Sequence, residues 1–249
     1  HVEPKGVPHL ILTHEQLVKR VNSELAIALL TTAKFLPRLK PILETWWNTS
    51  ESPDLVTIWS DSENQTGLGF HIPNLRDSKC ESSYNYGLWC KNIPMVKEWR
   101  TNPKYRNVKW FFRGTDDTYM HLENTLHLLD QYDHREPLMI GDRLCSEFGY
   151  EYPAGGSGFF LSRGFLDVWD TQTWTAPCRD PKRNRGSFFD DVMWGEYMHK
   201  MDFKQDGKPM RMIHHHGISQ AAFAYHSPIY NYYKKFMDGE NAWPFPYRI

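Results

Sequence analysis

Short apolar segments alternate with segments of helical spacing along most of this chain, and this alternation constrains its fold more than any other feature. Runs typical of buried strands occupy residues 24–31, 54–60, 108–114, 137–142 and 157–162. Apolar residues spaced three or four apart predict helices at 33–47, 91–100, 119–132 and 189–200. We therefore expect an α/β fold with a mostly parallel central sheet flanked by helices.

The 249 residues are expected to form a single domain. From about residue 221 the chain is rich in Tyr, Phe, Trp and Pro, which predicts an irregular wrap and not a second domain. Ligands of open α/β sheets bind beyond the carboxyl ends of the strands. The loops after residues 31, 60 and 114 are therefore where chemistry is expected.

The nearly neutral charge of the chain argues against one broad class of function. Its formal net charge is −1, whereas nucleic-acid-binding domains usually carry a strongly basic face. No stretch approaches the roughly 18 consecutive apolar residues that span a bilayer. Because the chain starts at His1, we expect a segment upstream of it, so any membrane attachment would come from an anchor outside these residues.

The four cysteines bear on the cellular compartment. Cys80 and Cys90 flank a short polar segment and are candidates for one disulfide, which leaves Cys145 and Cys178 as a second pair. Four free thiols are the alternative. Two Asn-x-Ser/Thr sequons also favour an oxidising compartment, although such triplets often arise by chance.

Two adjacent carboxylates, Asp116 and Asp117, follow the apolar strand at 108–114. Adjacent side chains on an extended chain point to opposite sides. One carboxylate can therefore bind a divalent cation such as Mn²⁺ or Mg²⁺ while the other bonds a ribose or sugar hydroxyl. The structural alternative is that Asp116 caps a helix that begins near Tyr119.

The segment AGGSGFFLSR at 154–163 contains glycines on both sides of Ser157. Glycine permits backbone torsions and close approaches that other residues do not, so a ligand could lie directly against this main chain. The spacing is not that of a dinucleotide-binding fingerprint. A tight turn that enters a strand is the alternative.

A second pair of carboxylates, Asp190 and Asp191, begins the predicted helix at 189–200. Carboxylates at a helix N-terminus are stabilised by the helix dipole, which is the structural explanation for this pair. The functional explanation is that Asp191 acts as a general base and takes the proton of an acceptor hydroxyl.

Three consecutive histidines, His214 to His216, form the last candidate. On an extended segment His214 and His216 share one face, with His215 opposite. A neutral imidazole can bind Mn²⁺ beside a carboxylate. An exposed polar loop is the alternative.

Seven blocks stand in this order along the chain: ALLTTAKFLPRLKPILETW, WSDSEN, the Cys80–Cys90 segment followed by Lys91, VKWFFRGTDDTY, AGGSGF, FDDVMWG and IHHH. Taken together, they resemble the fringe and core β1,3-glycosyltransferase family over residues 24–216.

The chain departs from the family pattern at three positions. The family has the first of three Asp residues at the position of Thr115, and fringe proteins have two disulfide-bonded cysteines at the positions of Phe112 and Phe160. We expect those two rings to pack together and join the same two strands.

The resemblance implies a single GT-A-like domain that binds a UDP-sugar donor and Mn²⁺ (or Mg²⁺) and transfers the sugar with inversion to a glycan or glycoprotein acceptor. It also implies residence in the Golgi or ER lumen, with a type II membrane anchor, or secretion. By position, the resemblance implies that Asp117 and His216 bind the metal, with His214 as second choice, and that Asp116 binds the donor's ribose or sugar. It implies that Asp191 is the catalytic base and that Gly155 and Gly156 line the donor–acceptor cleft. The residues implied to contact the nucleotide are Thr31, Thr32, Arg38 and Asp61.

Two other functions fit the same sequence. One is a non-catalytic relative that acts as a chaperone or sugar-binding protein, which the missing first Asp at Thr115 keeps open. The other is a metal-dependent hydrolase of nucleotide sugars or glycans, which would release UDP without any acceptor.

Overall fold

The computed structural model describes residues 12–47, 55–83, 86–145, 151–170, 174, 190–202, 210–214 and 219–221. The predicted wrap from about residue 221 falls almost wholly outside these residues. The same holds for His216 and for the proposed bond between Cys145 and Cys178, because the Cys145 side chain and residue 178 are not described. Within the described ranges, no helix is long and apolar enough to cross a membrane.

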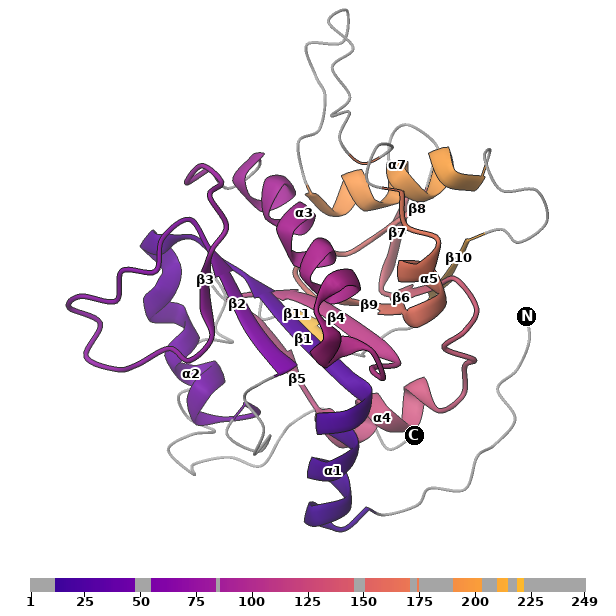
Figure 1. The fold of residues 1–249 in the computed structure, drawn as a ribbon, viewed down its shortest axis with the longest axis horizontal. Helices are drawn as coiled ribbons and strands as arrows, with labels where there is room; N and C mark the ends of the chain where they lie inside the picture. The colour runs from indigo at the N-terminus through magenta and orange to yellow at the C-terminus, as the bar shows by residue number, and fades with distance from the viewer. Residues whose placement is uncertain are drawn as a thin grey trace, which may run out of the picture.

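A seven-stranded sheet runs through the described part of the chain (Figure 1). Its strand order is β10-β6-β9-β4-β1-β2-β3, and every neighbouring pair is parallel except the two that involve β9. The predicted α/β fold with a mostly parallel sheet is thus confirmed. The strands are β1 (Leu25–Leu30), β2 (Val56–Ser60), β3 (Leu75–Asp77), β4 (Trp110–Thr115), β6 (Leu138–Gly141), β9 (Phe159–Ser162) and β10 (Arg211–His214).

Two small two-stranded sheets and a set of helices complete the described fold. The small sheets pair β5 (Thr118–Met120) with β11 (Ser219–Ala221), and β7 (Arg143–Cys145) with β8 (Glu151–Pro153). The helices are α1 (His14–Glu24), the 3-10 helix η1 (Ala33–Arg38), α2 (Leu39–Glu44), α3 (Tyr86–Thr101), the 3-10 helix η3 (Pro103–Tyr105), α4 (Leu122–Leu129), α5 (Arg163–Asp167) and α7 (Asp190–Asp202).

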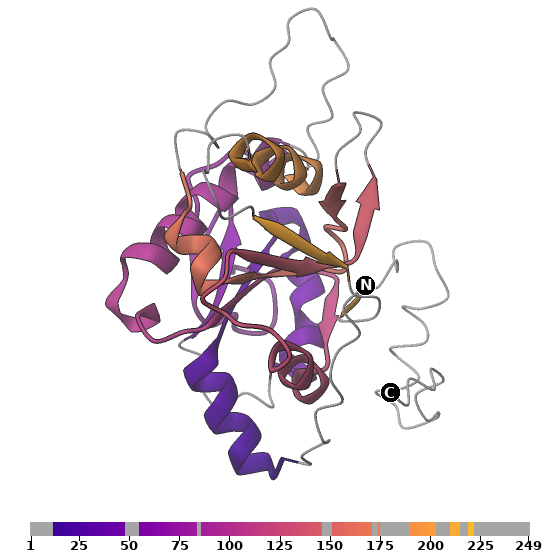
Figure 2. The same cartoon turned by 90° about the vertical axis from the view of Figure 1, so that its right-hand side faces the viewer.

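The central strands are buried on both faces, in keeping with their mostly apolar sequences. Alternate side chains of β1 belong to two different apolar clusters. One cluster joins the sheet to α3, α5 and α7, and the other joins it to α1, α2 and α4. Figure 2 shows α7 and α4 on opposite sides of the strands. The sheet is therefore the middle layer of three.

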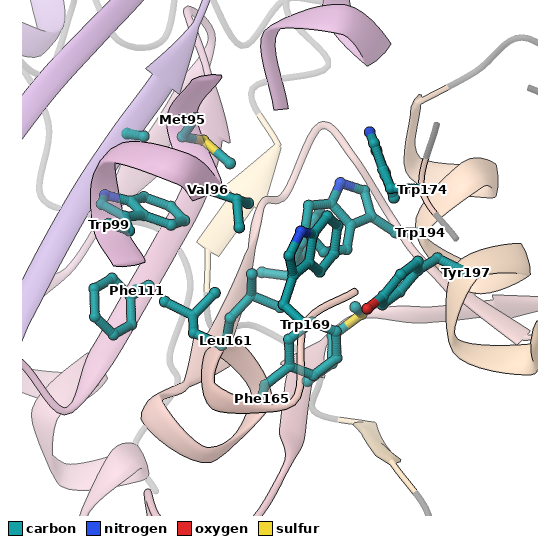
Figure 3. Packing of buried hydrophobic residues seen from close by; sticks show 14 of the residues in the cluster. Met95, Val96, Trp99, Phe111, Leu161, Phe165, Trp169, Trp174, Trp194 and Tyr197 are labelled. Carbon is teal, nitrogen blue, oxygen red and sulfur yellow. The ribbon is translucent and has the colours of Figure 1, made fainter. Parts of the chain in front are cut away.

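A cluster of aromatic side chains packs α7 against this core (Figure 3). The Trp194 ring centroid lies 4.6 Å from that of Trp174 and 5.0 Å from that of Trp169. The Tyr197 ring centroid lies 4.2 Å from that of Trp169. Large buried rings with few rotamers hold an element in place. The cluster therefore fixes α7, whose first turn carries Asp190 and Asp191.

The expected pairing of Phe112 with Phe160 is confirmed. The two residues lie opposite each other in the antiparallel ladder of β4 and β9, and their ring centroids are 4.7 Å apart. Both side chains are fully buried. A packed aromatic pair therefore joins β4 and β9.

The Cys80–Cys90 disulfide is also confirmed. It ties the loop after β3 to α3, which begins before Cys90 and continues to Thr101. The alternative that all four cysteines are free thiols is therefore wrong for Cys80 and Cys90.

Two predicted helices differ from the structure. The segment from Ala33 begins as the 3-10 helix η1, with Pro37 inside it, and only then becomes α2. The helix expected at 119–132 starts later, because Thr118–Met120 form strand β5 against β11. Pairing with a segment about 100 residues away overrode the local helical spacing there. The sequence prediction did not include α1, although Thr13 and Gln16 form a capping box at its start.

Replacing Phe112 with Ala should lower the free energy of unfolding by about 3–5 kcal/mol, because it empties a fully buried ring site between β4 and β9. Urea unfolding followed by fluorescence measures this loss. Leu144→Ala is the control, since that side chain is 42% exposed and its removal should cost less than about 0.5 kcal/mol. Equal losses in the two variants would contradict the packing described here.

Candidate active site

The carboxyl ends of six strands lie along one edge of the central sheet, because β1, β2, β3, β4, β6 and β10 all run in the same direction. Strand β9 runs the opposite way between β4 and β6, so the turn that precedes it reaches the same edge. This edge brings together segments that are far apart in the sequence. They are the residues after β1, β2 and β4, the turn before Phe159, and the end of β10 at His214.

Asp116 lies at this edge and is 6% exposed. Its Oδ2 accepts a hydrogen bond of 2.6 Å from the Thr31 hydroxyl, and its Oδ1 accepts one of 3.2 Å from Arg38. Burial is the main cause that raises the pKa of the Asp116 carboxyl to about 6. The alternative role of Asp116 as a helix cap is wrong, because the N-cap of α4 is His121.

Asp117 sits beside it and is held differently. Its Oδ1 accepts a hydrogen bond from the Thr115 hydroxyl. Burial raises the pKa of the Asp117 carboxyl above its ordinary value. The residue that replaces the family's first Asp thus donates a hydrogen bond to Asp117 and adds no third negative charge.

The turn at Gly155 and Gly156 connects the two pairs of carboxylates. The Thr118 hydroxyl, just beyond Asp117, donates to the Gly156 carbonyl at 3.2 Å. The Gly155 N–H donates to Asp191 Oδ2 at 3.1 Å. A Cβ on Gly155 would lie 3.0 Å from both the Cβ and Oδ2 atoms of Asp191, so glycine allows this close approach.

Asp191 lies in the first turn of α7, and backbone N–H groups orient both of its oxygens. Oδ2 is bound by Gly155, and Oδ1 accepts a hydrogen bond of 2.8 Å from the Val192 N–H. Its neighbour Asp190 points elsewhere, into a buried ion pair with Arg113. The two adjacent carboxylates therefore have different surroundings. The helix-dipole explanation applies to both, but Asp191 is the one whose carboxylate is hydrogen-bonded to the glycine turn, through the Gly155 N–H.

Asp61, after β2, has a structural partner at the same edge. Its Oδ1 accepts a hydrogen bond of 2.8 Å from the N–H of Ala33, the first residue of η1. Thr32 precedes that helix and is buried. Lys91 is 0% exposed, with its Nζ 3.9 Å from Asp61 Oδ1, and burial lowers the pKa of this lysine. Sequence reasoning matched Lys91 to a family motif but gave it no role.

The predicted metal-binding histidines are only partly described. His214 ends β10 and pairs in register with Gly141, but its side chain lies outside what the structure describes, as do His215 and His216. Within the described ranges, no three His, Cys, Asp or Glu side chains form a metal-binding group. The described candidates at this edge are thus Asp116 and Asp117.

Comparison with known proteins assigns the family. The sequence model of the Fringe-like family matches residues 21–216. This chain belongs to the Fringe-like family. The match includes every residue for which a site role was predicted from the sequence.

Several proteins similar to this Fringe-like chain are named glycosyltransferases. Human beta-1,3-N-acetylglucosaminyltransferase lunatic fringe is 28% identical over 155 residues, which cover 55% of this chain and 39% of that protein. Mouse beta-1,3-glucosyltransferase is 26% identical over 147 residues, covering 57% of this chain and 28% of that protein. This chain thus spans less than half the length of either relative.

A solved structure of a glycosyltransferase involved in the glycosylation of the major capsid of PBCV-1 is more distant. It is 12% identical, with a TM-score of 0.41, over 76% of this chain and 81% of that one.

The described residues of this Fringe-like chain suit a hard divalent cation. Carboxylate oxygens are the ligands that Mn²⁺ and Mg²⁺ prefer, and Asp117 supplies one such carboxylate, while the Asp116 oxygens are bonded to Thr31 and Arg38. The pKa of each carboxyl is raised by burial, so a cation nearby would favour the ionised form of both groups. Phosphate oxygens of a bound nucleotide would complete the coordination that the Asp117 carboxylate leaves open.

Asp116 should make a contribution to the stability of the metal-free protein that falls as the pH rises from about 4 to about 6. Over that range the folded protein holds a proton on Asp116, whose pKa is raised to about 6, while the unfolded chain has released it. A shift of about two pKa units corresponds to at most about 3 kcal/mol. Asp116→Asn should lose this component when urea unfolding is measured in EDTA at several pH values.

Asp133→Asn is the control, because Asp133 is solvent-exposed and its pKa is lowered by Arg135. That variant should keep the contribution of Asp116 between pH 4 and 6. Parallel stability curves for wild type and Asp116→Asn would contradict the assignment.

Proposed function

We propose that this chain is the catalytic part of an inverting, metal-dependent glycosyltransferase. It moves a hexose or N-acetylhexosamine from a UDP-sugar to an acceptor hydroxyl on a glycan or glycoprotein, with a β1,3 linkage. The observation that carries the proposal is the chain of hydrogen bonds that joins the Asp116–Asp117 turn to Asp191 through Gly155 and Gly156. Family membership and the names of its relatives support the same reaction class.

The donor nucleotide would lie over the ends of β1, β2 and β4. Arg38 supplies a fixed positive charge, stacked over the Phe35 ring at 3.5 Å and paired with Asp116. Asp116 would bind the ribose or sugar hydroxyls, because a carboxylate accepts hydrogen bonds from hydroxyl groups. Thr31 and Thr32 follow β1 and Asp61 follows β2, and these three residues would contact the nucleotide.

Asp117 would hold the divalent cation, Mn²⁺ or Mg²⁺, together with His216 or, as second choice, His214. When bound, the cation neutralises charge on the diphosphate leaving group. This chain's own part is to present a half-buried carboxylate in a fixed direction, which the Thr115 hydroxyl does by donating to Asp117 Oδ1.

Asp191 would act as the general base. The acceptor hydroxyl gives its proton to the Asp191 carboxylate while its oxygen bonds to the anomeric carbon, and the bond from that carbon to UDP breaks with its electron pair leaving on the phosphate. Attack from the face opposite UDP inverts the configuration, as in inverting glycosidases with an alcohol in place of water. The two backbone N–H bonds to Asp191 support this role because they fix the carboxylate against the glycine turn.

The compartment that suits this chemistry is the secretory pathway, in the Golgi or ER lumen. The Cys80–Cys90 disulfide supports an oxidising environment, since such bonds are rare in the reducing cytosol.

Asp191→Asn should bind UDP and Mn²⁺ as the wild type does but lose sugar transfer by at least about a thousandfold, because the amide cannot accept the acceptor's proton. Calorimetric titration with UDP and a transfer assay over a panel of UDP-sugars measure the two properties. Equal loss of binding and transfer would contradict the role of base. UDP release that is unchanged by omitting every acceptor would favour a hydrolase instead.

Asp117→Ala should weaken UDP binding at least about tenfold in buffer that contains Mn²⁺ but should change it little in EDTA, because the lost interaction runs through the cation. Asp133→Asn, an exposed carboxylate in the turn before β6, serves as the control and should bind UDP normally in both buffers. A loss for Asp117→Ala that is the same with and without metal would exclude its role as a metal ligand.

A further inference from the structure

Arg113 is a charged residue in the middle of the apolar strand β4, and it is 0% exposed. Its neighbours Phe111 and Phe112 point into the two opposite apolar clusters. Removing a guanidinium from water is costly unless ionic and hydrogen-bonding partners replace the water. The groups that contact Arg113 therefore indicate the role of this residue.

Two of those partners are next to Asp191: one precedes it in the sequence, and the other binds its carboxylate. The Arg113 guanidinium forms an ion pair with Asp190, the residue directly before Asp191. It also donates a hydrogen bond of 3.2 Å to the carbonyl of Gly155, whose N–H binds Asp191 Oδ2. One side chain thus connects the start of α7 with the glycine turn at the two points between which Asp191 is held.

A third helix reinforces this connection. Asn92 of α3 donates to Asp190 Oδ2 at 3.4 Å and accepts a hydrogen bond of 3.3 Å from the Trp194 indole of α7. Both Asn92 and Asp190 are buried. Asp190 is therefore bound by groups from β4 and α3, in a network with little solvent to compete for its bonds.

Stability alone does not require an ion pair at this position. A buried ion pair replaced by apolar residues of similar total volume often leaves stability unchanged or higher. Apolar side chains, however, cannot bind the Gly155 carbonyl or fix the direction of Asp190. Because Asp190 is paired with the Arg113 cation, Asp191 and not Asp190 is the carboxylate that would take the proton of the acceptor.

We propose that Arg113 is a positioning residue, which through its contacts with Asp190 and Gly155 holds Asp191 in the orientation needed for proton transfer. This inference rests on the role proposed for Asp191. It adds a residue outside the predicted set, and it separates the functions of the adjacent carboxylates: Asp190 anchors the helix, and Asp191 meets the acceptor.

The test compares the apolar double variant Arg113→Met/Asp190→Leu with the single variant Arg113→Met. The single variant leaves Asp190 buried without this cation and should lower the urea midpoint strongly, whereas the double variant should recover most of that loss. If Arg113 positions Asp191, the double variant still loses at least about tenfold in kcat while its KM for the donor stays within about threefold of wild type. A double variant with wild-type kcat would overturn the proposal.

A second readout does not depend on turnover. The Gly155 amide, which donates to Asp191, should exchange with solvent at least about tenfold faster in the double variant than in the wild type, as measured by NMR. If no UDP-sugar is transferred by the wild type, the proposed function fails, but this exchange rate still decides whether Arg113 holds the turn. Unchanged exchange would overturn the positioning role.

Two further variants complete the design. Arg113→Lys keeps a cation for Asp190 and should fold, but a single ammonium cannot reproduce the fork that reaches both partners, so kcat should still fall severalfold. This variant carries the test if the double variant does not fold, and wild-type kcat in it would contradict the proposal. The control is Arg20→Met/Asp130→Leu, which removes the ion pair between α1 and the end of α4 and should leave kcat and Gly155 exchange unchanged.

Discussion

The direction of strand β9 is the constraint on which the candidate site depends. In a fully parallel sheet, the turn before a strand lies at the edge opposite the carboxyl ends. Because β9 runs antiparallel between β4 and β6, its leading turn with Gly155 and Gly156 reaches the edge where Asp116 and Asp117 follow β4. The Phe112–Phe160 pair stabilises this arrangement from within the core. The direction of β9 thus determines both its pairing in the sheet and the position of the glycine turn at the site.

The candidate site contains several charged side chains that are buried. Asp116, Asp190, Arg113 and Lys91 are all buried, and each carries a desolvation cost that only a partner can offset. Asp190 has its cation in Arg113. Asp116 and Asp117 have the Arg38 guanidinium and two hydroxyl donors, yet the pKa of each carboxyl is still raised. This imbalance is what a divalent cation bound with a diphosphate would correct.

Much of the fold could be predicted because its signals are local. The apolar runs that became β1, β2, β4, β6 and β9 are long and buried, and their order between helices predicts a parallel sheet. Strand β5 could not be predicted, since it exists through pairing with residues 219–221. Helix α1 was missed although its capping box, Thr13 to Gln16, was a usable signal.

The site shows the same division between local and long-range information. Motifs indicated Asp116, Asp117, Gly155 and Asp191, but the hydrogen bonds between them depend on how three loops meet. The sequence prediction treats Arg113 only as part of an apolar strand and assigns it no role. A single charged residue inside such a strand is, however, a signal that it has a specific partner. The histidines at 214–216 stay a prediction, because their side chains lie outside the described residues.

If the carboxyl edge of the sheet forms one site for a nucleotide and a metal, Mn²⁺ bound with UDP should broaden the amide NMR signals of residues at that edge, with Mg²⁺ and UDP as the diamagnetic reference. We expect broadening at Asp117, Gly155 and Gly156, and none at residues 133–136, which lie before β6 at the opposite edge. Broadening at that opposite edge, or none at the glycine turn, would contradict the presence of one site at the carboxyl edge.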